Sequence, residues 1–337
     1  MSLVAAWRRF CGRVHSRPQI EASCRAASWW SRTTGNSPPL RSRPHAWSVC
    51  ARDWSQHASQ ASEQGQDVNP GVDARLLAVS RETEHVKRFT LAPAPGFRFL
   101  PGQWVDLFPP ETSGVTAVGG YSFASTPLKL QKEGTFDLLI REARHPVAQW
   151  LHRQAQPGCQ VRVNVGGAFH IRDEYLGRPM IFLAGGIGIT PLYSILRHVW
   201  EQGQLDGGAA RDSPLLLLYS VKDERDFALC PEISEMARGS DPDRFQVWDA
   251  VTEISAADAG QARPSVLLPP LASSRRITRI ITATDVQDAV SWATERSQSP
   301  HGPVAFLCGP PAFSDTCAAH LSACGLRNED IIYERWW

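Results

Sequence analysis

The residues best suited to chemistry lie in a glycine-rich turn, residues 182–196 with the sequence FLAGGIGITPLYSIL. Thr190 is the expected N-cap and Pro191 the expected first residue of the helix that follows. Before them, a buried-strand pattern runs into three glycines: Gly185, Gly186 and Gly188. Glycines let a backbone approach a bulky anion, and the free amides and dipole of a helix start attract phosphate. The turn predicts a dinucleotide site; the alternative is a tight turn that binds nothing.

A second stretch, residues 305–313 with the sequence AFLCGPPAF, puts a thiol at the end of a strand. The strand expected over 304–307 runs into Cys308, Gly309 and Pro310. Ligands of open parallel sheets collect at the carboxyl ends of the strands, which makes Cys308 a candidate site residue. The alternative is a small buried Cys without a binding role.

A third stretch, residues 118–127, reads VGGYSFASTP. Two adjacent glycines weaken a strand, yet an aromatic residue and several hydroxyls follow them at once. This combination is unusual for a strand and marks the stretch as a candidate site.

Two kinds of pattern surround these stretches. Before the glycine-rich turn come six short β-rich runs and one helix-like turn at 146–151; the runs are 72–80, 85–91, 103–108, 120–125, 135–140 and 160–165. Six short strands in about a hundred residues predict a closed antiparallel barrel.

After that, strand and helix patterns alternate. Strands are expected at 180–184, 215–220, 245–251 and 304–307, and helices at 191–201, 284–296 and 312–324. Alternation of this kind predicts a doubly wound parallel sheet with helices on both faces. We place the barrel domain at 72–174 and the dinucleotide-binding α/β domain at 175–337.

The first 52 residues have a different composition, with nine Arg, no Lys and one acidic residue. Removing them from the totals of 35 basic and 34 acidic residues leaves a body of charge about −7. An Arg- and Ser-rich leader predicts a mitochondrial transit peptide, with a secretory signal or a disordered basic tail as alternatives. Residues 53–71 are the expected linker.

Cysteine usage and hydropathy narrow the class of protein further. None of the eight Cys forms a CxxC pair, so neither structural zinc nor an iron–sulfur cluster is indicated, and no metal is expected. The apolar run at 214–221 falls far short of the ~20 residues that cross a bilayer. We expect a reduced intracellular protein with no membrane span and no nucleic-acid partner.

Taken together, a GGxGxTP turn, a CGPP segment about 120 residues later and a barrel before both resemble the ferredoxin–NADP reductase superfamily. The resemblance covers about residues 72–337, and within the superfamily it is greatest to the oxidoreductase NAD-binding domain-containing protein 1 group. It implies that the barrel is a Greek-key barrel of the flavin-binding type. It also implies a flavin-dependent NAD(P)H oxidoreductase that passes hydride from nicotinamide to flavin, and electrons on to an acceptor that the sequence does not identify.

The resemblance also implies roles for individual residues. The pyrophosphate would lie on the turn Gly185, Gly186, Ile187, Gly188, Ile189, Thr190 and Pro191. Cys308, Gly309 and Pro310 would border the nicotinamide, with Glu334 nearby. Tyr121 would stack on the isoalloxazine, Ser122 would lie near the flavin N5, and the terminal Trp337 would cover the ring until nicotinamide displaces it. The residues expected to touch the reacting rings are therefore Ser122, Cys308 and Glu334.

The chain departs from the superfamily where the flavin phosphate is held. Gly119 stands where the family has an Arg, and His145 and Ala148 replace the ends of its Gly-x-x-Ser/Thr motif. Losing an Arg–phosphate contact costs on the order of 1.5 to 3 kcal/mol, which is tenfold or more in affinity. Arg141 and Arg144 are the candidates to replace it.

Three functions stay open on this evidence. The favoured one is an oxidoreductase with weakened recognition of the phosphate of FAD or FMN. The alternative is an NAD(H)-binding sensor or assembly partner that has lost flavin and catalysis. An inert relative is disfavoured because both glycine motifs are intact.

The choice between NAD and NADP depends on the segment after the second strand of the α/β domain. Lys222 and Arg225 are candidates to receive a 2′-phosphate, and Asp223 is a candidate to accept a 2′-hydroxyl. We expect NAD from the group resemblance and keep NADP as the alternative.

Overall fold

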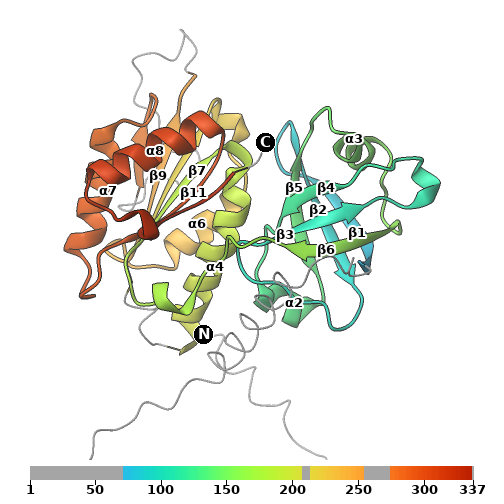
Figure 1. The fold of residues 1–337 in the computed structure, drawn as a ribbon, viewed down its shortest axis with the longest axis horizontal. Coiled ribbons are helices and arrows are strands. Elements are labelled where there is room, and N and C mark those ends of the chain that lie inside the picture. The colour runs from blue at the N-terminus through green and yellow to red at the C-terminus, as the bar shows by residue number, and fades with distance from the viewer. Residues whose placement is uncertain (1–70, 207–212, 254–273, 336–337) are drawn as a thin grey trace, which may run out of the picture. The chain divides into compact units, whose positions relative to one another are not determined.

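A six-stranded antiparallel sheet forms the first half of the structure (Figure 1). This computed structural model describes residues 71–206, 213–253 and 274–335, all within one unit, residues 50–337. The strands are β1 (Val72–Arg81), β2 (Val86–Pro93), β3 (Trp104–Phe108), β4 (Gly119–Ser122), β5 (Phe136–Arg141) and β6 (Gln160–Gly166). The expected leader, nearly all of the linker and Trp337 lie outside the described residues.

The strand order of this sheet is β4-β3-β6-β1-β2-β5, with β4 and β5 at its two ends. Directly after β4, Phe123 makes an antiparallel bridge to Leu138 of β5, and the Ala124 amide donates to the Asp137 carbonyl at 2.8 Å. The first and last strands of the sheet therefore meet, which confirms the predicted barrel.

The barrel core comes from alternate residues of each strand, since successive side chains point to opposite faces. Val105, Leu107, Phe123 and Leu138 are fully buried, and the Phe99 ring stacks on Phe123 with centroids 3.7 Å apart. Two helices belong to this half: α2 (Pro127–Glu133) and α3 (Pro146–Arg153). Helix α3 turns a buried face that includes Trp150 toward this core.

The second half is a six-stranded sheet in which every pairing is parallel, with the order β10-β9-β8-β7-β11-β12. Its strands are β7 (Met180–Gly185), β8 (Leu215–Val221), β9 (Phe245–Val251), β10 (Ser274–Ile277), β11 (Val304–Cys308) and β12 (Ile331–Glu334). The helices are α4 (Ile189–Asp206), α6 (Cys230–Arg238), α7 (Ala283–Glu295) and α8 (Pro311–Ala323).

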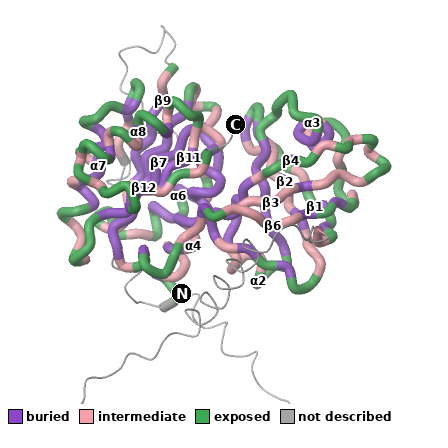
Figure 2. The backbone as a smooth tube through the Cα atoms, viewed as in Figure 1, coloured by how far each residue is buried: buried purple, intermediate pink, exposed green. Residues whose placement is uncertain are grey.

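Helices cover both faces of this parallel sheet. Phe182 of β7 belongs to a buried cluster with Leu192 of α4 and Ile233 of α6, whereas its neighbour Leu183 belongs to one with Val286 of α7 and Leu321 of α8. Every residue of β7 and β11 is buried, as Figure 2 shows. The predicted doubly wound sheet is therefore confirmed.

The strand order reverses between β7 and β11. From β7 the chain proceeds outward through β8, β9 and β10, then returns to the other side of β7 to add β11 and β12. Because these strands are parallel, the carboxyl ends of β7 and β11 are neighbours. The glycine-rich turn and the Cys308 segment follow these two ends, at the position where doubly wound sheets bind ligands.

The start of α4 differs from the prediction. A single 3-10 turn, η3 (Gly186–Gly188), continues into α4 at Ile189, so the expectation that Thr190 is an N-cap was wrong. Its hydroxyl instead donates to the Ile187 carbonyl at 3.0 Å, as it does inside a helix. Pro191 is tolerated at the third position because the first amides of a helix have no intrahelical acceptor.

None of the helices in the described ranges has the length and hydropathy of a membrane span. Two α-helices and two strands in those ranges were not predicted: α2, α6, β10 and β12.

Candidate functional site

The glycine-rich turn and the Cys308 segment lie against each other. A Cβ on Gly188 would overlap the Cys308 carbonyl group and come within 2.8 Å of the Gly309 nitrogen. One on Gly309 would come within 3.0 Å of the Gly185 Cα. These three positions need glycine because two backbones touch there. The two motifs predicted from separate stretches are thus parts of one site.

Gly186 differs from its neighbours. Its φ of +56° favours glycine, and a Cβ placed on it would find no atom within 4 Å. It directly follows β7 and begins the helical turn, whose first amides precede the helical hydrogen-bond pattern. An anion approaching this open backbone meets unpaired amides and the positive end of α4.

Cys308 and Glu334 are register neighbours on β11 and β12. Burial, together with the nearby Glu334 carboxylate, raises the pKa of the Cys308 thiol to about 12. Cys308 is therefore a neutral thiol at physiological pH. Partial burial also raises the pKa of Glu334, which makes no hydrogen bond or ion pair with another described residue. Glu334 thus joins Cys308 at the edge where the glycine turn lies.

Tyr121 and Ser122 of β4 point to opposite faces of the barrel sheet. Ser122 pairs in register with Trp104, and Tyr121 pairs with the fully buried Val105. Tyr121 accordingly packs against the barrel core. The side chain of Ser122 is buried and makes no hydrogen bond within the described part of the chain.

The ring of Tyr121 lies over Gly119. A Cβ on Gly119 would be 2.6 Å from the Tyr121 hydroxyl oxygen and 2.7 Å from its Cε2. The hydroxyl is buried and has no hydrogen-bond partner among the described residues, and this burial raises the pKa of Tyr121. The position at which the superfamily has a phosphate-binding Arg is therefore covered by an aromatic side chain.

The start of α3, where the superfamily has its second phosphate motif, offers few donors. Pro146 has no amide hydrogen, His145 makes no side-chain capping bond, and Ala148 is a buried methyl group. Arg141 and Arg144 are exposed, and neither pairs with a described residue. The residues present fit a dinucleotide at the glycine turn; they do not fit a tightly held flavin phosphate.

Buried contacts join the barrel to the glycine turn. Ala124 and Leu139 of the barrel belong to the same buried cluster as Ile189 of α4. The fully buried Ser194 of α4 donates from its hydroxyl to the Ser125 carbonyl at 2.6 Å. Ser122 lies two residues before Ala124, so the β4 hydroxyl belongs to the part of the barrel beside the dinucleotide turn.

The loop after β8 lies where doubly wound sheets bind the adenosine ribose. Its charged residues form two separate groups of ion pairs. Asp223 holds Arg225 through two oxygens, with distances of 2.9 Å to Nε and 2.7 Å to Nη2, and these bonds lower the pKa of Asp223 to about 2. Glu224 accepts from Arg276 at 2.7 Å, and Arg276 also donates to the buried Asp249 at 2.7 Å.

Sequence reasoning missed Glu224, Asp249 and Arg276. The three residues come from a loop and two strands that are far apart in the chain, and only the parallel pairing of β9 and β10 puts Asp249 beside Arg276. No spacing rule along the sequence signals such a group.

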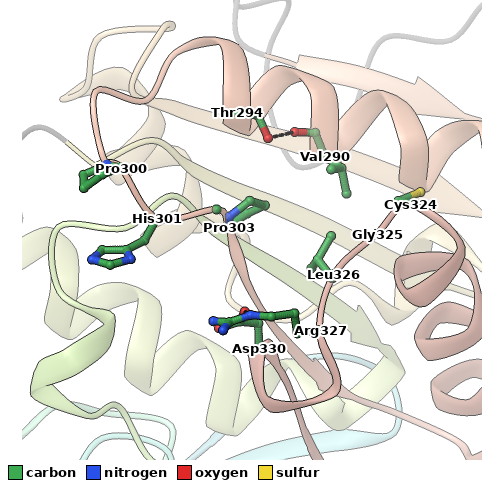
Figure 3. A pocket seen from close by; sticks show the side chains of 11 residues that line it. Val290, Thr294, Pro300, His301, Pro303, Cys324, Gly325, Leu326, Arg327 and Asp330 are labelled. Atoms are coloured by element: carbon green, nitrogen blue, oxygen red, sulfur yellow. Dashed lines mark hydrogen bonds and ion pairs between the residues drawn. The ribbon is translucent and has the colours of Figure 1, made fainter.

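A cavity of about 400 Å³ lies at the amino ends of β11 and β12, whereas the glycine-rich turn lies at the carboxyl end of β7 (Figure 3). Pro303 and Asp330, which line it, directly precede β11 and β12. Within it Arg327 donates to Asp330 at 2.8 Å, and the Thr294 hydroxyl donates to the Val290 carbonyl at 2.7 Å. This cavity contains none of the predicted site residues.

Comparison with known proteins identifies the family. A family model described as the oxidoreductase NAD-binding domain matches residues 182–266, which begin in β7. The oxidoreductase NAD-binding domain-containing protein 1 of Danio rerio is 34% identical over 270 residues, covering 78% of this chain and 91% of that protein. The chain belongs to the oxidoreductase NAD-binding domain-containing protein 1 family.

Solved structures place this family member in the ferredoxin reductase fold. A cytochrome P450 reductase from Amycolatopsis matches with a TM-score of 0.58 at 24% identity, covering 78% of this chain and 69% of that one. A ferredoxin NADP⁺ reductase from Neisseria gonorrhoeae, with bound FAD and NADP, matches with a TM-score of 0.56 at 19% identity, covering 78% and 97%. These matches confirm the fold that the superfamily resemblance implies.

Proposed function

We propose that this chain is an NAD(H)-dependent oxidoreductase of the ferredoxin reductase type. The dinucleotide would bind across the carboxyl ends of β7 and β11, and its nicotinamide would give a hydride to an acceptor on the barrel side. The observation that carries this proposal is the backbone contact of Gly188 with Cys308 and Gly309, which joins two binding motifs at the reversal of strand order.

Positioning is the main task of the residues in this site. The open backbone at Gly186 and the amides of the first turn would hold the pyrophosphate. Cys308, as a neutral thiol, would pack beside the nicotinamide, with Glu334 on the adjacent strand. Ser122 would face the acceptor. Hydride transfer needs two rings held in contact and little acid–base chemistry from side chains.

A flavin acceptor is the finer form of this proposal. The superfamily resemblance supports it, and the Neisseria reductase of the same fold is named with bound FAD. The covered position at Gly119 instead favours a second candidate, an NAD(H)-binding sensor or assembly partner without flavin. The visible absorption spectrum of the purified full chain separates tightly bound flavin from none.

Dinucleotide binding is tested at Gly186. Asp and Asn tolerate positive φ better than most residues and have the same shape, so Gly186→Asn and Gly186→Asp differ only in charge. We expect Gly186→Asp to weaken NADH binding about tenfold more than Gly186→Asn, because its carboxylate would face the pyrophosphate. Quenching of protein fluorescence by NADH measures both constants. Equal affinities for the two variants would contradict the proposal.

Mitochondrial import is the location we propose, on the composition of residues 1–52. A fluorescent fusion of residues 1–60 tests it in cells. Mitochondrial signal is the expected result, secretion would support the alternative, and diffuse cytosolic signal would contradict import.

A further inference from the structure

A hydroxyl and an indole are neighbours on the barrel strands β3 and β4. The Leu100 amide donates to Gln103 Oε1 at 2.7 Å, and Gln103 Nε2 donates to the Gly167 carbonyl at 3.0 Å, which fixes the turn before β3. The next residue, Trp104, lies in register with Ser122. Ser122 has no hydrogen-bond partner in the described ranges. A hydroxyl and an indole thus stand side by side on one face of the barrel.

The same barrel has no receptor built for a phosphate. The Tyr121 ring covers Gly119, and its buried hydroxyl has no hydrogen-bond partner in the part of the chain that the structure describes. Pro146 and Ala148 remove an amide hydrogen and a side-chain hydroxyl from the start of α3. Arg141 and Arg144 are exposed, so water and salt screen their attraction for an anion. Recognition of a flavin at this end would not depend on its phosphate.

We propose that free flavin is an exchangeable substrate of this chain, recognised by its ring and not by its phosphate. This inference rests on the proposed NAD(H) oxidoreductase function and names the class of acceptor. Weak binding follows because no charged hydrogen bond to phosphate is available, and such bonds carry much of the affinity of a nucleotide. Riboflavin, FMN and FAD would then be nearly equivalent substrates.

The reaction balances without a further oxidant. The C4–H bond of the dihydronicotinamide breaks and an N5–H bond forms on the oxidised isoalloxazine, as hydride carries two electrons from NADH to flavin. A proton from solvent adds to flavin N1. NAD⁺ and dihydroflavin leave as products.

The test uses the full chain under anaerobic conditions. Riboflavin, FMN and FAD are each supplied as acceptor while NADH oxidation is followed, and NADH binding is measured separately by fluorescence. We expect protein that purifies without flavin and KM values for the three flavins within about fivefold of one another, since only screened charges distinguish them. A stoichiometric bound flavin, or a preference above tenfold for FMN or FAD, overturns the inference.

Gly119→Arg supplies the missing cation, and Gln131→Arg is its control. Gln131 is an exposed residue of α2, and its replacement adds the same charge away from β4. We expect Gly119→Arg to lower the KM of FMN and FAD about tenfold relative to riboflavin, and Gln131→Arg to leave the three values close together. An unchanged ratio in Gly119→Arg would overturn the assignment of this end of the barrel.

Two failures are distinguishable. If NADH binds and none of the three flavins is reduced, flavin is not the substrate although the dinucleotide site stands. If NADH does not bind, the proposed function fails together with this inference.

Discussion

Gly188 in the dinucleotide turn and Gly119 in the barrel each have a neighbour too close for a Cβ, but the neighbours differ in kind. At Gly188 they are backbone atoms of Cys308 and Gly309, held by the pairing of β7 with β11. At Gly119 the nearest atoms are the far end of the Tyr121 side chain. The backbone of a central strand cannot move away from an added methyl group without breaking its pairing with its neighbours, whereas a tyrosine ring can rotate away.

This difference indicates which half of the molecule was free to change. A substitution at Gly188 disturbs the sheet as well as the site, so folding itself preserves the dinucleotide turn. A residue at position 119 contacts a side chain and does not determine the path of the backbone. A substitution there is therefore expected to cost less folding free energy than one at Gly188.

Gly188→Ala gives the largest expected effect. Its methyl group would overlap the Cys308 carbonyl, and we expect the free energy of unfolding to fall by about 3 kcal/mol or more. Chemical denaturation measures the change. Gly302→Ala is the control, because a Cβ there meets no atom within 4 Å. Similar free energies of unfolding for the two variants would contradict the claim that backbone contact makes glycine necessary at position 188.

Ser194→Ala tests the junction between the two halves. The Ser194 hydroxyl donates to the Ser125 carbonyl at 2.6 Å in a fully buried position, and its removal leaves that acceptor without this donor. We expect a loss of about 1 to 3 kcal/mol in the free energy of unfolding. Ser291→Ala, at a partly exposed serine of α7, should change stability by much less. A negligible effect of Ser194→Ala would mean that this bond does not hold the halves together.

Glu224→Gln tests the choice of dinucleotide. The loop after β8 and its neighbours present more carboxylates than cations, and Arg276 is shared between Glu224 and Asp249. Removing the charge of Glu224 should raise the affinity for NADPH relative to NADH about tenfold, since a 2′-phosphate would meet less repulsion. Titration of both dinucleotides gives the ratio. Glu295→Gln, at an exposed residue, removes the same charge far along the chain and should leave the ratio unchanged.

Apolar periodicity was sufficient to predict the barrel strands and four strands of the parallel sheet, β7, β8, β9 and β11. It was not sufficient for β10, whose sequence SRRI contains two arginines. Arg275 lies over the Trp248 ring and pairs with Asp288 at 2.7 Å, whereas Arg276 pairs with Asp249. Both arginines are paired with residues from other elements, and this pairing cannot be inferred from the local sequence of β10.

The candidate site was predictable to a different degree in each half. Gly185 and Cys308 end strands β7 and β11, and Gly188 lies shortly after β7, so a parallel sheet brings them together by its topology alone. The cover over Gly119 depends on the rotamer of Tyr121, which no pattern of residue types specifies. Sequence could therefore indicate that an arginine was missing, but not what fills its place.

Gly119→Ala gives the smallest expected effect and completes the comparison with Gly188. A methyl group there would be 2.6 Å from the Tyr121 hydroxyl, so the ring must move, and the lower entropy of the unfolded chain offsets part of this cost. We expect the free energy of unfolding to change by less than about 1 kcal/mol. In a Tyr121→Phe background the closest atom is absent, so the same substitution should be still milder, and a double-mutant cycle measures that coupling. A loss as large as that of Gly188→Ala would show that Tyr121 is fixed as firmly as backbone, in which case the barrel is no freer to change than the dinucleotide turn.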